Sequence, residues 1–86
     1  MANKLYIIRI DVAYNGDFIV IPHTNRKVAL KDFYERIKKW EDGLKEPAKK
    51  LLETDTQIEI DVRDSKSEEG ASFYFNEVRS AEELIL

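Results

Sequence analysis

Two alternating apolar segments flank Asn15-Gly16, and this pattern limits the fold more than any other feature of the chain. Alternation with a period of two is typical of half-buried β-strands. Asn-Gly favours the positive φ angles of a two-residue type I′ turn. We therefore expect a β-hairpin over residues 4–21, with Val12 opposite Ile19 and Ile10 opposite Ile21. One of its faces is expected to enter the core: Tyr6, Ile8, Ile10, Val12, Ile19 and Ile21.

The second face of this hairpin is also mostly apolar, although it includes Arg9 and Asp11. A sheet face that contacts only water usually alternates to polar residues more cleanly. Apolar side chains that remain exposed and are bordered by charge are typical of an interaction surface. The sequence thus predicts a surface for a protein partner or for self-association, made of Leu5, Ile7, Phe18 and Val20.

The remaining elements follow from changes in periodicity along the chain. Apolar residues from Leu30 to Leu44 follow the helical period, with Gly43 as a residue that could end the helix. Pro47 suits the first turn of a second helix over residues 47–53. Strand patterns follow over residues 56–63 and 71–79, and the spacing of Ser80 and Glu83 resembles a capping box.

This order of elements, ββααββ, predicts one α+β domain over residues 1–86. We expect an antiparallel four-stranded sheet with two helices packed on one face. The 86 residues hold no cysteine, and no apolar run approaches the length of a membrane helix. The residues before the first strand lack the pattern of a secretory leader, so we expect none. The sequence therefore predicts a cytoplasmic protein without a membrane partner.

Residues with catalytic or metal-binding chemistry are scarce. His23 is the only histidine, and the three glycines form no phosphate-binding loop. Glu59 and Asp61 could bind a hard cation together with Asp64 or Glu77, although a hydrophilic strand face has the same pattern. We therefore expect no enzymatic activity, no catalytic residues, no cofactor and no metal site.

Charge is distributed unevenly along the chain. Residues 26–50 hold nine Lys or Arg against five Asp or Glu, whereas residues 51–86 hold three against ten. An acidic surface keeps a protein soluble, and it also suits a basic partner, including a protein that binds nucleic acid. The residues predicted to form a partner-binding acidic surface are Glu59, Asp61, Asp64, Glu68, Glu69 and Glu77.

Two alternatives stay open beside a protein-binding surface. A basic helical face with Lys38, Lys39, Lys49 and Lys50 could contact nucleic acid through its phosphates. Acidic residues interrupt this face and the isoelectric point is about 5.2, so nucleic acid is the less favoured partner. The other alternative is a homodimer or larger homo-oligomer that buries Ile7, Phe18 and Val20.

These observations favour one expectation for function. The leftover apolar face, the acidic C-terminal third and the scarcity of catalytic side chains indicate a non-enzymatic protein-binding module. We expect it to act as an inhibitor or regulator of a larger protein. Small acidic domains of this composition also occur among proteins of phages and mobile elements, so the composition is compatible with such an origin.

Overall fold

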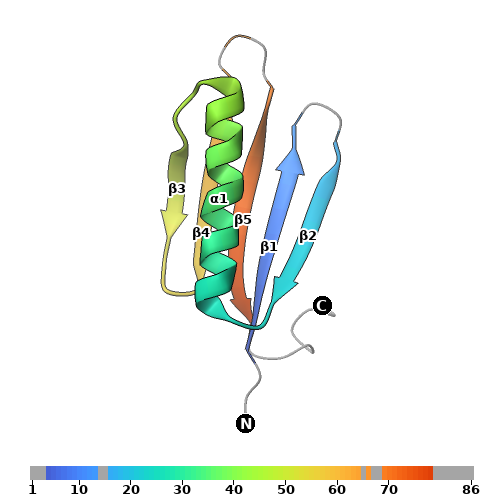
Figure 1. Cartoon of the computed structure of the whole chain (residues 1–86), viewed down its shortest axis with the longest axis vertical. Coiled ribbons are helices and arrows are strands. Elements are labelled where there is room, and N and C mark those ends of the chain that lie inside the picture. Colours follow the sequence, from blue (N-terminus) through green and yellow to red (C-terminus); the bar gives the residue numbers. More distant parts are fainter. Residues whose placement is uncertain (1–3, 14–15, 65, 67–68, 79–86) are drawn as a thin grey trace.

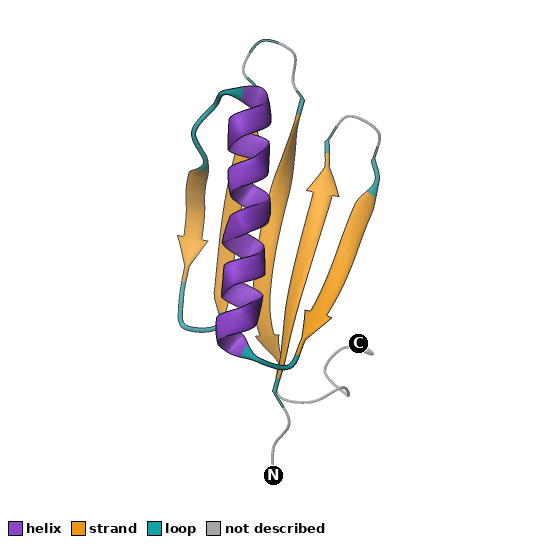
Figure 2. Ribbon diagram, viewed as in Figure 1, coloured by secondary structure: helices purple, strands orange, loops and turns teal. Residues whose placement is uncertain are grey.

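The computed structural model describes residues 4–13, 16–64, 66 and 69–78, which form five strands and one helix. The sheet has the strand order β2-β1-β5-β4-β3, every neighbouring pair is antiparallel, and α1 lies on one face of the sheet (Figures 1 and 2). The elements in chain order are β1 (Leu5–Val12), β2 (Phe18–His23), α1 (Arg26–Leu44), β3 (Lys49–Glu53), β4 (Gln57–Arg63) and β5 (Gly70–Val78).

The prediction of four strands and two helices is wrong, because residues 49–53 form an edge strand instead of a second helix. Lys, Leu and Glu all favour helices, but this segment pairs with β4, whose outer edge would otherwise have no partner strand. The backbone N–H of Ala48 donates to Glu41 Oε2 at 2.7 Å and fixes the turn that leads into β3. Sheet pairing therefore prevails over local helix propensity here.

The helix ends differ from the prediction by a few residues. Asn25 caps the N-terminus, where its Oδ1 accepts a hydrogen bond from the Val28 N–H at 3.1 Å. The helix thus begins at Arg26, earlier than the predicted Leu30. At the other end Gly43 remains helical, and Lys45 adopts the left-handed conformation (φ 57°) and donates its N–H to the Glu41 carbonyl.

The core lies between α1 and the sheet. Phe33 is fully buried, and its ring centroid lies 5.8 Å from that of Phe75 and 6.4 Å from that of Phe73. Aromatic contacts of this kind add to the stabilisation from burying apolar area. The buried residues are Tyr6, Ile8, Ile10, Ala29, Phe33, Ile37, Ile58, Ile60, Val62, Ala71, Phe73 and Phe75.

The first hairpin forms as predicted, but its register differs by two residues. Ile10 pairs with Ile19, and the Val12 N–H donates to the Asp17 carbonyl at 2.8 Å. Four residues therefore lie between Val12 and Asp17, in place of the predicted two-residue loop. A shift of two preserves the face of every side chain. Gly16 has the expected positive φ (73°), whereas Asn15 lies outside the described residues.

The two later strand predictions agree with β4 and β5 to within one residue at each end. The predicted capping box at Ser80 and Glu83, like the apolar residues 84–86 that follow it, lies outside the described residues. β5 lies between β1 and β4, so the last strand joins the N-terminal hairpin to the rest of the sheet. This order places residues from β1, β5 and β4 side by side on the face opposite α1.

Candidate interaction surface

The face of the sheet opposite α1 (the open face) is covered by none of the described elements, since all five strands form the sheet and α1 lies on its other side (Figure 1). Directly paired residues share a face, so the register defines rows across it. One row runs through Val20, Arg9, Tyr74, Glu59 and Leu52. The next runs through Phe18, Asp11, Ser72, Asp61 and Lys49.

The four apolar residues predicted from the hairpin lie together on this open face. Phe18 is 62% exposed and Val20 is 52% exposed, while Leu5 and Ile7 are half-buried. Pro22 stands opposite Ile7 on the same face and extends the apolar region along β2. The structure thus brings Leu5, Ile7, Phe18 and Val20 into one exposed region at the β1–β2 side of the sheet.

A shallow depression of 340 Å³ lies beside this apolar region. The Nε of Arg9 donates to Asp11 Oδ1 at 2.8 Å, and the hydrogen bond and charge of Asp11 raise the pKa of Arg9. The Arg9 guanidinium also lies 5.3 Å from the centre of the Phe18 ring, a cation–π arrangement. Residues lining the depression are Arg9, Asp11, Tyr74 and Asn76. Alternation along each strand places them on the face away from the core, but only the β1–β5 pairing brings them together.

The predicted acidic surface is divided among three places. Glu59 and Asp61 lie on the open face, next to the depression, and Asp61 forms a 3.9 Å ion pair with Arg63. Asp64 and Glu69 lie at the turn between β4 and β5, where the Asp64 N–H donates to the Glu69 carbonyl. Glu68 lies outside the described residues.

Glu77, the sixth predicted acidic residue, lies on the helix side of the sheet. It pairs with Tyr6 in the β1–β5 register, and its carboxylate lies 3.7 Å from the Lys4 amine and 3.5 Å from the Arg26 guanidinium. This carboxylate therefore links β5 to the start of α1. Of the predicted acidic residues that the structure describes, only Glu59 and Asp61 lie on the open face, and β5 separates them from the apolar region.

The four lysines of the predicted basic helical face are also separated. Lys38 and Lys39 are exposed on α1, but Lys49 and Lys50 belong to β3. Lys49 pairs with Asp61 on the open face, whereas Lys50 donates to Glu53 at 2.9 Å, an interaction that raises the pKa of Lys50. The basic helical face that the sequence suggested is therefore not formed, because its second half is not a helix.

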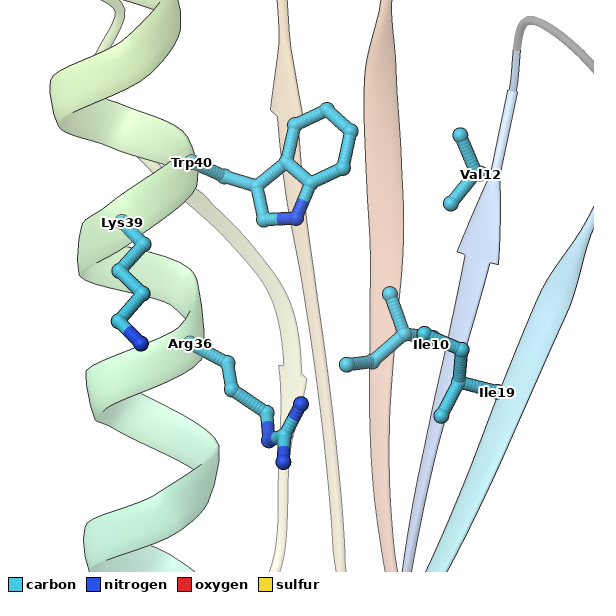
Figure 3. Close-up of a pocket in the computed structure, with 6 residues that line it drawn as sticks. All are labelled: Ile10, Val12, Ile19, Arg36, Lys39 and Trp40. Atoms are coloured by element: carbon cyan, nitrogen blue, oxygen red, sulfur yellow. The ribbon is translucent and has the colours of Figure 1, made fainter.

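A second hollow, of 140 Å³, lies on the helix side between α1 and the β1–β2 hairpin. Trp40 and Arg36 extend from α1 toward Ile10 and Ile19, as Figure 3 shows. Ile19 stays 46% exposed because the helix does not extend over β2. The β1–β2 hairpin is thus incompletely covered on both of its faces. Val12 and Lys39 complete the lining of this hollow.

His23 contacts a carboxylate of the helix. Its Nε2 lies 2.8 Å from Asp32 Oδ2, and Asp32 Oδ1 accepts from Arg36 Nε at 2.8 Å. Burial acts to raise the pKa of Asp32, but the hydrogen bonds from His23 and Arg36 outweigh it, and the pKa is lowered. Among the described residues, no group of three or more His, Asp or Glu side chains is arranged to hold a metal ion.

No family model, curated protein or solved structure matches this chain. Within the described ranges, no helix combines the length and the apolar character needed to cross a membrane.

Proposed function

We propose that this chain is a non-enzymatic protein-binding module that inhibits or regulates a larger protein through the open face of its sheet. The observation that carries this proposal is the exposure of Phe18 and Val20 on a sheet face that no described element covers. Burying large apolar side chains of this kind supplies much of the free energy of protein association. An uncovered apolar region beside charged residues is typical of such a surface.

The open face carries charges of both signs, and the carboxylates of β4 are the ones that suit a basic partner. Glu59 and Asp61 lie on β4, two strands away from the apolar residues of β1, with Tyr74 and Ser72 of β5 between them. A complementary surface would place apolar side chains against Phe18 and Val20 and basic side chains against Glu59 and Asp61. Surfaces that bind nucleic acid are rich in Lys and Arg, so a nucleic-acid-binding protein is the partner class that this arrangement favours.

Capture from a lysate of the source cells, with and without nuclease and read by mass spectrometry, tests the proposal. We expect one protein to be recovered in stoichiometric amount from both samples, and at least tenfold less of it with the double variant Glu59→Lys/Asp61→Lys. The double variant Glu35→Lys/Asp42→Lys, at two exposed positions on α1, makes the same change in net charge and should leave recovery unchanged. Recovery that disappears with nuclease would contradict the proposal. Recovery that is indifferent to Glu59→Lys/Asp61→Lys would remove these two carboxylates from the proposed surface.

A further inference from the structure

The two edges of the sheet differ in how they are protected against pairing with another strand. β3 carries Lys49, Lys50 and Glu53, and its register shifts between Lys50 and Leu52. Charges and bulges of this kind are what natural edge strands use to prevent further pairing. β2 has no charged side chain and no irregularity between Phe18 and Ile21. The β2 edge is therefore the one that is open to a further strand.

The hydrogen bonds of the hairpin show which backbone groups of β2 point outward. Val12 and Asp17 form a hydrogen-bonded pair, and such pairs alternate along an antiparallel ladder. Ile19 and Ile21 consequently bond to β1, while the N–H and C=O groups of Phe18 and Val20 point away from it. The described part of the chain offers these outward groups no hydrogen-bond partner. Pro22 is the next outward position, and it has no N–H to donate.

We propose that a second copy of this chain pairs with β2 in antiparallel orientation about a two-fold axis, with Phe18 of each copy opposite Val20 of the other. This register lets all the outward groups of Phe18 and Val20 bond, giving four backbone hydrogen bonds across the axis. A register that places Phe18 opposite Pro22 also allows four bonds, but it leaves the Phe18 carbonyl of each copy without a donor, because Pro22 has no N–H. The position of the proline therefore selects the first register.

Side chains on both faces of β2 fit this pairing. On the helix side, Ile19 of one copy meets Ile19 of the other, and the contact buries part of a side chain that is 46% exposed in the single chain. On the open face, Phe18 of each copy packs beside Val20 of the other. An extended segment that pairs here needs apolar residues on both of its faces, and β2 itself is such a segment.

Charges on β1 lie at the ends of the rows that cross the same axis. Arg9 is paired with Val20 and Asp11 with Phe18, so each row of the joined sheet runs from Arg9 of one copy to Asp11 of the other. Each row thus has a positive charge at one end and a negative charge at the other, with Val20 and Phe18 between them. A continuous ten-stranded sheet would result from this pairing. The few exposed side chains on β2 cannot supply the roughly 800 Å² per partner of a stable interface, so we expect a reversible, concentration-dependent dimer.

Sedimentation velocity of the full chain over a wide concentration range tests this inference. We expect the mass to rise from monomer to dimer with concentration. Val20→Pro removes the outward N–H but leaves the bonds to β1 intact, and Val20→Lys adds a charge to the edge; each should weaken dimerisation at least tenfold. Leu51→Lys makes a matched change at the β3 edge, where Leu51 is 53% exposed, and should dimerise like the parent chain.

A parent chain that stays monomeric at every concentration would overturn the inference. So would a dimer that survives in the folded Val20→Lys variant, or one that Leu51→Lys abolishes. If Val20→Pro loses its circular dichroism signal, Val20→Lys alone decides the result. This pairing uses the backbone edge of β2, whereas the proposed function uses the open face of the sheet. Dimerisation can therefore fail while partner binding holds, and the reverse.

Discussion

His23 Nε2 lies 2.8 Å from Asp32 Oδ2, and this contact joins the last residue of β2 to α1. Arg36 binds the other carboxylate oxygen, so Asp32 accepts from both the sheet and its own helix. The contact holds the end of the hairpin close to a helix that leaves most of β2 uncovered (Figure 1). Asp32 therefore orients the strand whose edge and open face carry the proposed interactions.

The lowered pKa of Asp32 predicts a pH dependence of stability. Its carboxylate stabilises the fold above the ordinary pKa of 3.8, and this contribution is lost as the pH falls below that value toward the lower pKa of the folded state. We expect Asp32→Asn to reduce the free energy of unfolding by about 1 kcal/mol at neutral pH, and by much less in acid. Urea unfolding at both pH values measures the difference.

Asp42→Asn is the control for this prediction, because Asp42 is exposed on the same helix and the described residues give it no ion pair or hydrogen bond. Its stability should follow that of the parent chain at both pH values. An equal loss for Asp32→Asn at neutral and acid pH would show that the ionised carboxylate is not what stabilises the contact.

The two glycines in regular elements should respond oppositely to alanine. A Cβ at Gly70 would meet the Val62 carbonyl oxygen and lie 2.8 Å from the Arg63 Cα, both backbone atoms of the paired strand. We expect Gly70→Ala to cost about 1–3 kcal/mol of stability. Gly43 is helical with open space around it, so Gly43→Ala should raise the free energy of unfolding by as much as about 1 kcal/mol. Thermal unfolding of both variants provides the test, and a stable Gly70→Ala protein would contradict the close β4–β5 approach.

Phe33 and Tyr34 are neighbours in the helix with very different surroundings. Phe33 is fully buried against Phe73 and Phe75, whereas Tyr34 is 40% exposed. We expect Phe33→Ala to lower the free energy of unfolding by about 3–5 kcal/mol, a large part of the stability of a domain this size. Tyr34→Ala should lower the free energy of unfolding by far less. Chemical denaturation measures the free energy of unfolding of both variants. Similar losses in the two would contradict the position of α1 on the sheet.

The hairpin and its two faces could be predicted from the sequence because alternation fixes the face of each side chain without a knowledge of the partner strands. The same alternation correctly placed Glu59 and Asp61 away from the core. Alternation also explains the position of Glu77. It is an even number of residues from Phe73 and Phe75 and therefore lies with them on the helix side. Charge alone groups Glu77 with Glu59 and Asp61, whereas its position in the strand places it on the opposite face of the sheet from them.

The edge strand β3 and the strand order could not be predicted in the same way. The segment at residues 49–53 has the local preferences of a helix, and only its pairing with β4 makes it a strand. The place of β5 between β1 and β4 depends on contacts between distant parts of the chain. The Arg9–Tyr74 depression and the free β2 edge both follow from that order, and so they become visible only in the folded chain.

Amide hydrogen exchange along β2 tests most directly the claim that this hairpin is open to a partner. In dilute protein the amides of Phe18 and Val20 should exchange much faster than those of Ile19 and Ile21, which bond to β1. In concentrated protein the Phe18 and Val20 amides should slow, while that of Glu53 on the other edge should not change. Slow exchange of Phe18 and Val20 in dilute monomer would mean that the edge is already paired, and would contradict the account.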